Sequence, residues 1–321
     1  MILVTGAAGF IGSCMVTKLN RRGHTDIILA DDFNRPVKRR NLFNKKYAGS
    51  TDRMTIFDFI DNYPDHFEFI YHLGARTDTT EMDTAVHTRL NLEYSKRLWH
   101  KCVQYQIPIV YASSAATYGD GSLGYKDDHD IIPSLQPLNP YGVSKNEFDK
   151  WVLLQKDTPP FWAGLKFFNV FGPNEYHKSR MASVVLQSYK QIVTEGRVKL
   201  FKSHKKEYQD GEQLRDFIYV KDVIDVLWWM YENRKNSGIY NLGTGKARTF
   251  LDLTHAVFHA LQLQPYIEYI DTPIDIRDKY QYYTEANMYK LKKIGYDKPF
   301  TYLEEAITEY VKLFLSRNAY F

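Results

Sequence analysis

Short apolar runs alternate along the first half of the chain with segments whose apolar residues recur at helical spacing. Ile2–Thr5 and residues 26–30 lack the polar alternation of a half-exposed strand, which favours strands buried on both faces. The helical pattern of residues 10–22 lies between them. This alternation is typical of a parallel sheet with helices on both faces. The pattern predicts further strands at 67–73, 108–113 and 164–168, a long helix ending near Tyr105, and a helix that contains Tyr141.

The pattern becomes less regular after about residue 170. It predicts helices at 181–194, 221–233, 249–262 and 301–316, and short strands at VKLF and RDFIYV. We therefore expect a large unit at 1–170 and a smaller one at 171–321, with segments near 215–245 returning to the first. The predicted fold class is α/β: a Rossmann-type doubly wound parallel sheet with a smaller, mixed α/β domain.

Composition excludes several classes of protein. A formal net charge of +4 in 321 residues does not argue for nucleic-acid or membrane binding. Two cysteines, Cys14 and Cys102, cannot form a disulfide framework, which favours a reduced, cytoplasmic compartment. No apolar run is long enough for a signal peptide or a membrane span. We also expect no metal site, because His72 has no second ligand at metal spacing.

The segment TGAAGFIG follows the first predicted strand and begins the first helix. Gly6 permits a tight turn, Gly9 lets the backbone approach a pyrophosphate, and Gly12 permits close packing of helix on strand. Asp31 and Asp32 follow about twenty positions later, at the end of the second strand. This context favours a dinucleotide site over an ordinary glycine-rich turn, so we assign 1–170 as a dinucleotide-binding domain.

The choice between NAD and NADP stays open from these residues alone. Asp31 at this position is typical of a contact to ribose hydroxyls and disfavours a 2′-phosphate. Arg35, Lys38, Arg39 and Arg40 follow immediately and could neutralise such a phosphate. The two indications are about equally strong.

Tyr141 and Lys145 stand four residues apart in NPYGVSK, behind a proline that favours a helix start. Lowering a tyrosine pKa from about 10 to about 7 takes about 4 kcal/mol. One positive charge about 4 Å away supplies about that much at an effective dielectric constant near 20. Upstream, YASSAATYG ends a strand with Ser113 and Ser114, and a serine hydroxyl there could share the proton with a substrate oxygen.

Together these motifs resemble the extended short-chain dehydrogenase/reductase family, whose members remodel nucleotide-linked sugars. The resemblance is carried by TGAAGFIG, SSAATYG, PYGVSK, RDFIYVKDV and YNLGTG. The segments LGARTDTTEMD, FFNVFGPNEYHKSRMAS, YQYYTEAN and GYDKPF resemble the branch of that family whose members invert C6 of an ADP-linked heptose. The similar segments run through nearly the whole chain.

The resemblance implies oxidation at C6 of ADP-D-glycero-D-manno-heptose and reduction on the opposite face, with bound NADP and no net redox change. The product would be a precursor of the lipopolysaccharide core. Tyr141 would be one acid/base and Lys178 the other. Lys145 would hold the nicotinamide ribose and lower the pKa of Tyr141, and Ser114 would hydrogen-bond the reacting oxygen.

The resemblance also favours NADP, because Lys38 falls where a lysine of the family meets the 2′-phosphate; NAD is the alternative. It implies a homo-oligomer, with a pentamer as the expected size. The implied cofactor-binding residues are Gly6, Gly9, Phe10, Ile11, Gly12, Asp31, Asp32, Lys38, Arg53, Leu73, Gly74, Ala75, Arg76, Thr77, Asn91, Tyr141, Lys145, Val170 and Lys178. The implied substrate-binding residues are Ser114, Asn169, Arg180, Gln187, Phe201, Arg215 and Tyr280.

The chain departs from the family pattern at HKSRMAS, where Ser179 replaces a glycine and Arg180 a serine, and at Gln187, which replaces a histidine. The segment 202–214 is also longer than the family leads us to expect. Two rival functions stay open. A UDP-sugar 4-epimerase would share the glycine loop and the Tyr–Lys pair but would use one base, and a non-catalytic NADP-binding sensor would typically lose Tyr141 or Lys145.

Overall fold

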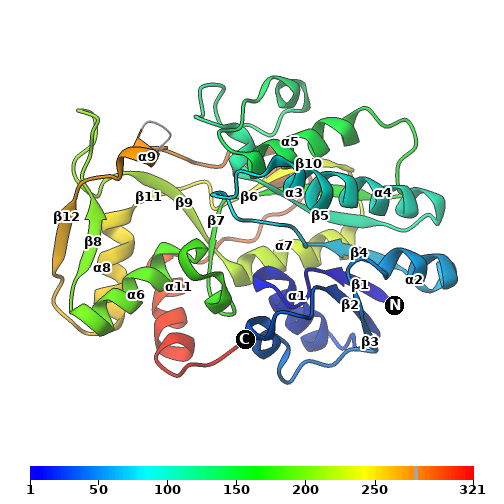
Figure 1. Cartoon of the computed structure of the whole chain (residues 1–321), viewed down its shortest axis with the longest axis horizontal. Coiled ribbons are helices and arrows are strands. Elements are labelled where there is room, and N and C mark those ends of the chain that lie inside the picture. Colours follow the sequence, from blue (N-terminus) through cyan, green and yellow to red (C-terminus); the bar gives the residue numbers. More distant parts are fainter. Residues whose placement is uncertain (278–280) are drawn as a thin grey trace.

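The computed structural model describes residues 1–277 and 281–321. A seven-stranded sheet, in which every pair of neighbours is parallel, forms its larger layer (Figure 1). The strand order is β10-β6-β5-β4-β1-β2-β3, so the winding direction reverses between β1 and β4. This confirms the predicted doubly wound sheet, and ligands bind at such a reversal in this architecture. The strands are β1 (Ile2–Thr5), β2 (Ile27–Asp31), β3 (Gly49–Asp52), β4 (Phe69–His72), β5 (Ile109–Ser114), β6 (Trp162–Phe167) and β10 (Gly238–Leu242).

Helices cover both faces of this sheet (Figure 1). Helices α1 (Phe10–Arg21) and α7 (Val220–Asn233) pack together on one face. Helices α4 (Tyr94–Gln104) and α5 (Pro140–Leu153) lie on the other, with α2 (Ile56–Asn62) beside α4. The all-buried strands therefore have an apolar layer above and below, as their lack of alternation predicts.

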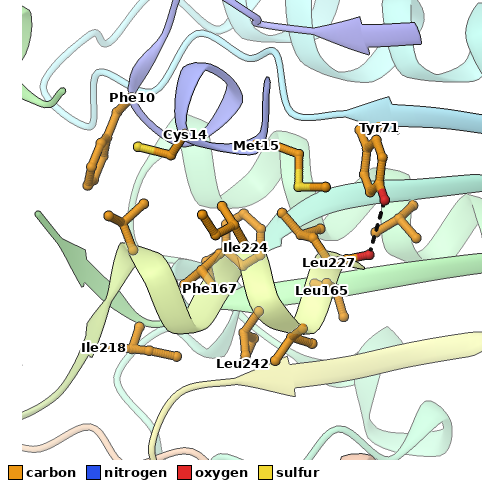
Figure 2. Close-up of a cluster of buried hydrophobic side chains, with 14 of the residues drawn as sticks. Phe10, Cys14, Met15, Tyr71, Leu165, Phe167, Ile218, Ile224, Leu227 and Leu242 are labelled. Atoms are coloured by element: carbon orange, nitrogen blue, oxygen red, sulfur yellow. Dashed lines mark hydrogen bonds between the residues drawn. The ribbon is translucent and has the colours of Figure 1, made fainter. Parts of the chain in front are cut away.

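Apolar side chains of α1 and α7 meet over the sheet in one continuous core (Figure 2). Cys14 and Met15 of α1 lie next to Ile224 and Leu227 of α7, and the Tyr71 hydroxyl of β4 donates to the Leu227 carbonyl at 3.4 Å. Both cysteines are buried and free. Helix α7 therefore packs on α1, and strand β10 pairs with β6 of the large sheet; the division of the chain into two domains stays a prediction.

The rest of the chain forms two small sheets with helices packed on them. Strands β7 (Asn169–Phe171), β9 (Leu214–Tyr219) and β11 (Ala247–Thr249) form one sheet, and β8 (Val198–Phe201) pairs with β12 (Ile267–Ile270) in the other. This matches the expected smaller, mixed part. Its longer helices are α6 (Val184–Glu195), α8 (Phe250–Ala260) and α11 (Leu303–Glu309).

Short helical turns complete the chain. They are η1 (Pro36–Leu42), η2 (Pro64–His66), α3 (Thr84–His87), η3 (Thr88–Glu93), η4 (Ala115–Tyr118), η5 (His129–Ser134), η6 (Tyr176–Met181), α9 (Ile274–Arg277), α10 (Tyr289–Lys293) and η7 (Tyr310–Leu315). No helix within the described ranges has the length and apolar character needed to cross a membrane.

Candidate functional site

The turn between β1 and α1 brings three segments of backbone into close approach. Gly6 has φ = +65°, and a Cβ atom there would lie 2.6 Å from the Gly74 Cα at the end of β4. A Cβ atom on Gly12 would lie 2.1 Å from the Gly6 carbonyl oxygen. Gly9 precedes α1 and gives it no side-chain cap, so the first-turn N–H groups and the positive helix end can serve a diphosphate.

Asp31 closes this turn from the end of β2. Its carboxylate accepts hydrogen bonds from the Ala8 backbone N–H at 2.9 Å and from Lys38 Nζ at 2.8 Å. The Asp31 side chain is 5% exposed, so it is held rigidly beside the glycine loop. Lys38 therefore stands next to the carboxylate that, in this architecture, takes the ribose hydroxyls.

The basic residues after β2 line two different hollows. Arg35, Lys38 and Arg53 line the cleft above the glycine loop, and Arg35 and Arg53 also lie 3.2 and 3.8 Å from Asp32. Arg39 and Arg40 instead line a separate hollow near the end of the chain. Only the first group is placed to meet a dinucleotide, a division that the sequence did not reveal.

The cleft has a volume of about 430 Å³ and opens at the carboxyl ends of β1, β2 and β4. Most of the residues that we expected to bind the cofactor line it. These are Gly6, Gly9, Phe10, Ile11, Gly12, Asp31, Lys38, Arg53, Leu73, Gly74, Ala75, Arg76, Thr77 and Lys178, joined by Arg180 from the substrate group.

Five of the expected cofactor-binding residues do not line the cleft, and their role stays a prediction. Asp32, Asn91, Tyr141, Lys145 and Val170 are not among the cleft-lining residues. Sequence reasoning missed several that are: Thr5, Asp78, Leu90, Tyr94, His177, Ser179 and Met181. A signal existed for two of these groups, because Leu90 and Tyr94 lie within one helical turn of Asn91, and His177, Ser179 and Met181 belong to the HKSRMAS motif.

Asn91 does not line the cleft itself but supports residues that do. Its side-chain amide accepts from the Arg76 N–H at 2.8 Å and donates to the Arg76 carbonyl at 3.0 Å. It also donates to the Ser144 hydroxyl of α5 at 3.0 Å. Asn91 thus ties the segment after β4 to the helix that carries Tyr141.

Tyr141 lies in the first turn of α5, which begins where Asn139 accepts a hydrogen bond from the Gly142 N–H at 2.8 Å. Burial raises the pKa of Tyr141, a side-chain hydrogen bond with Ser114 acts in the opposite direction, and the charge of Asp149 raises it again. The sequence did not predict this contact between Tyr141 and Ser114, and the expected hydrogen bond of Ser114 to the reacting oxygen stays a prediction. The acidification of Tyr141 by Lys145 also stays a prediction, one that a bound nicotinamide cation would assist.

Lys145 lies one turn further along α5 and is nearly fully buried. Its Nζ donates to the Ala112 carbonyl of β5 at 2.7 Å. Burial lowers the pKa of Lys145 to about 8, and the charge of Asp149 opposes that shift. His72 of β4, which bonds Thr5 at 2.7 Å and Ser95 at 2.8 Å, has its pKa lowered to about 3 by burial first and by Lys145 second.

The turn η6 lines the cleft through residues 177–181. Lys178 Nζ lies 5.7 Å from the centre of the Phe10 ring, and burial lowers the pKa of Lys178 while Glu175 raises it. Arg180, expected to touch substrate, bonds the Thr80 hydroxyl and lies 4.0 Å from Asp78. These contacts join η6 to the segment after β4 across the cleft.

Gln187 of α6 helps to hold the turn η6 in place. Its side-chain amide donates to the Ser179 carbonyl at 2.8 Å. The expected substrate contacts of Arg180 and Gln187 are thus engaged, in this structure, in holding η6. A role toward substrate stays a prediction for both residues.

Ser179 adopts φ = 49° and ψ = −123°, a conformation that favours glycine. We expect Ser179→Gly to raise the free energy of unfolding by about 1 kcal/mol, because relief of about 1–3 kcal/mol of backbone strain exceeds the entropic cost of glycine. Urea denaturation measures it. Ala182→Gly, at φ = −68°, is the matched control and should lose stability. Equal losses in both variants would contradict the assignment of strain.

The remaining substrate candidates lie in the smaller part and do not line the cleft. Asn169 begins β7 and is exposed, and Phe201 ends β8. Arg215 on β9 is 7% exposed and donates to the Leu214 carbonyl at 2.8 Å and to the Gln281 carbonyl. Tyr280 lies outside the described residues. Substrate contacts of this group stay predictions.

The chain is similar to known proteins over nearly its whole length. The family model described as NAD dependent epimerase/dehydratase matches residues 2–243. A protein of Fusobacterium nucleatum named ADP-L-glycero-D-manno-heptose-6-epimerase is 46% identical and covers 99% of both chains. A protein of the same name from Nitratidesulfovibrio vulgaris is 47% identical and covers 98% of both.

A solved structure extends the similarity to the fold. The crystal structure of Helicobacter pylori ADP-L-glycero-D-manno-heptose-6-epimerase is 28% identical, with a TM-score of 0.81. It covers 97% of this chain, which covers 94% of that one. The two folds therefore correspond across both the large sheet and the smaller part.

Proposed function

The chain belongs to the NAD dependent epimerase/dehydratase family, and from that premise we infer that it is an isomerase acting on an ADP-linked heptose. The reaction is inversion at C6, which converts ADP-D-glycero-D-manno-heptose into ADP-L-glycero-D-manno-heptose. A nicotinamide dinucleotide is its cofactor, and a nucleotide sugar is its substrate. We propose that the product serves lipopolysaccharide core synthesis in the cytoplasm.

The residues of the cleft fit a dinucleotide. Glycine at positions 6 and 12 leaves space that a Cβ atom would fill, directly before an uncapped helix start. Arg35, Lys38 and Arg53 supply positive charge on the same cleft. Backbone N–H groups for a diphosphate and cations beside the adenosine ribose are the chemistry that such a cofactor needs.

The bound dinucleotide would supply the hydride acceptor for C6 and return the hydride afterwards. Tyr141 would accept the proton of the C6 hydroxyl, and Ser114 would hold that oxygen through the hydrogen bond that it shares with Tyr141. Lys145 would keep positive charge beside the phenol. Lys178, which lines the cleft from η6, would exchange the proton when the reacting group is presented in its second pose.

Burial gives Lys178 a pKa below the ordinary lysine value. A larger neutral fraction near neutral pH makes its amine a better proton acceptor. A surface lysine would keep its ordinary pKa and remain almost fully protonated. The observation that carries the two-base mechanism is this placement of a half-buried lysine on the wall of a cleft that the glycine loop forms.

Product analysis tests the function directly. The purified protein is loaded with NADP and incubated with ADP-D-glycero-D-manno-heptose, and the C6 epimers are separated by chromatography and identified by NMR. We expect both epimers and no accumulation of reduced cofactor. Conversion of UDP-glucose at C4 without C6 inversion would favour the 4-epimerase, and retained dinucleotide without any conversion would favour the sensor.

We propose NADP as the cofactor because Lys38 stands beside Asp31 at the ribose end of the cleft. Lys38→Met should weaken NADP binding at least about 10-fold, the loss of one charge-assisted hydrogen bond, and leave NAD binding nearly unchanged. Fluorescence titration with each dinucleotide measures both constants. Arg39→Met, which faces the other hollow, is the matched control and should bind NADP normally. Equal weakening for NAD and NADP would contradict the 2′-phosphate contact.

We also propose a homo-oligomer, as the family resemblance implies, with a pentamer as the expected size. Light scattering at micromolar concentration should give about five times the chain mass. Within each chain, residues 171–321 would mainly serve the substrate and residues 1–170 the dinucleotide. A monomeric mass with full activity would contradict the proposed assembly.

A further inference from the structure

A buried ion pair involves the face of helix α5 that carries Tyr141 and Lys145. Asp149 and Lys166 have side chains that are both 0% exposed, and Lys166 Nζ lies 2.7 Å from an Asp149 carboxylate oxygen. Lys166 belongs to β6, an interior strand of the large sheet between β10 and β5. Taking two charges out of water is costly, and well-packed apolar residues could fill the same space at little or no loss of stability. Stability alone therefore does not explain why the chain has an ion pair at this position.

Asp149 stands four residues after Lys145 and eight after Tyr141. Residues at this spacing share one face of a helix. That face meets β5, which ends in Ser114. The charge of Asp149 reaches both functional side chains, since it raises the pKa of Tyr141 and of Lys145.

Four successive residues of β5 are tied to this face of α5. The Tyr111 hydroxyl donates to Asp149 at 3.1 Å and the Ser113 hydroxyl at 2.6 Å. The Ala112 carbonyl between them accepts from Lys145 at 2.7 Å. Ser114 completes the series with its hydrogen bond to Tyr141. Asp149 thus fixes the strand on both sides of the Lys145 contact.

Lys166 anchors Asp149 from the neighbouring strand. Its Nζ also donates to the Thr117 hydroxyl of η4 at 2.7 Å and lies 5.2 Å from the centre of the Tyr118 ring. Thr117 in turn donates to the Ser114 carbonyl at 2.8 Å. The ion pair therefore contacts β5 and η4, the two segments that meet at Ser114.

We propose that Asp149, anchored by Lys166, is a positioning residue for the reaction: it aligns Ser114, Tyr141 and Lys145, and its negative charge keeps Lys145 protonated at neutral pH. The inference rests on the proposed function for its kinetic readout. The titratable groups around Lys145 are Tyr141 and Asp149 on α5 and His72 on β4, with Lys166 of β6 behind Asp149. A buried lysine surrounded by neutral groups would lose its proton more readily.

The sign of the pH effect follows from these charges. Burial holds the pKa of Lys145 at about 8, and Asp149 opposes a further fall. In Asp149→Asn that opposing charge is gone, so the pKa of Lys145 should drop by about 1 unit or more. The alkaline limb of the kcat profile should move down by the same amount, because neutral Lys145 cannot favour the phenolate of Tyr141.

The titration of Lys145 provides a readout that needs no substrate. The full chain, loaded with NADP, is labelled with 13Cε-lysine and titrated by NMR, with Lys145→Arg used for assignment. Glu147→Gln is the matched control, because Glu147 lies on the exposed face of the same helix, where it pairs with Lys150 at 3.0 Å. We expect a lower titration midpoint of Lys145 in Asp149→Asn and an unchanged midpoint in Glu147→Gln. In Asp149→Glu, the midpoint and the alkaline limb of the kcat profile should both return part of the way to the parent values.

Asp149→Asn leaves Lys166 buried without its partner and could unfold the chain. The double variant Asp149→Asn/Lys166→Met removes that unpaired charge and provides the second test. It should recover stability while its Lys145 midpoint and alkaline limb stay low. An unchanged Lys145 midpoint in a folded Asp149 variant would overturn the proposal. If the parent protein fails to epimerise ADP-heptose but the midpoint still moves, the proposed function fails and the electrostatic role stands.

Discussion

Tyr141→Phe is expected to lower kcat for C6 epimerisation by about 100- to 10,000-fold, the range that general acid–base catalysis contributes. The change removes one hydroxyl, so the ring keeps its packing beside His87, 6.3 Å away between ring centres. Dinucleotide binding should stay within about 3-fold, because the glycine loop and Asp31 are untouched. Separation of the two epimers by chromatography measures the rate, and fluorescence titration measures cofactor binding.

The matched control for this variant is Tyr63→Phe. Tyr63 is 46% exposed and lies after α2, away from the cleft, so its hydroxyl should not affect turnover. Full activity in Tyr141→Phe would remove the phenol from the mechanism. A fall in dinucleotide affinity that accounts for the whole loss of rate would give Tyr141 a binding role instead of a catalytic one.

Lys178→Met should lower kcat for C6 epimerisation by about 100-fold or more, and this effect does not depend on Tyr141. Methionine keeps most of the side-chain volume next to Phe10 but cannot exchange a proton. If Tyr141 and Lys178 serve opposite poses of the reacting group, either change alone blocks inversion. Each variant should still oxidise and reduce the sugar in the one pose that its remaining base serves.

Isotope labelling separates these two roles. With a substrate deuterated at C6, rapid quenching and mass spectrometry of the dinucleotide measure the deuteride that it has received, and so report whether one pose is still oxidised. Lys190→Met is the matched control, because Lys190 lies exposed on α6. If Lys178→Met and Tyr141→Phe both keep full turnover, the two-base mechanism is wrong. Loss of dinucleotide binding in Lys178→Met would assign the lysine to the cofactor alone.

The parts of the fold that the sequence predicted are those with strong local signals. Strand β1, the glycine turn and α1 each follow from a few neighbouring residues, and so does α5 with Asn139 and Pro140 at its start. Strand β3 carries the sequence GSTD, with alternate residues exposed, and was not predicted. Strand β10, sequence GIYNL, was not predicted either, because its burial depends on pairing with β6 from 75 residues earlier.

The candidate site likewise combines features that local sequence predicts with features that depend on tertiary packing. The glycine loop and Asp31 follow from motifs and strand order, as does the placement of Tyr141 and Lys145 one turn apart on one helix. The bond of Lys145 to the Ala112 carbonyl and the pair of Asp149 with Lys166 depend on tertiary packing. Lys166 stands in the apolar run GLKFF, where a single lysine gives no sign that it is fully buried. A motif identifies which residues carry chemistry, but the partners that tune them come from elsewhere in the chain.

The position of β10 has a consequence for synthesis on the ribosome. Residues 238–242 pair with 163–167, so β6 is an interior strand only after residue 242 has been made. Until then its row of backbone N–H and C=O groups forms an open edge, which invites pairing with other chains. At about 5–20 residues per second, the nascent chain carries that open edge for on the order of ten seconds. Chaperone protection should therefore matter most during this interval of translation.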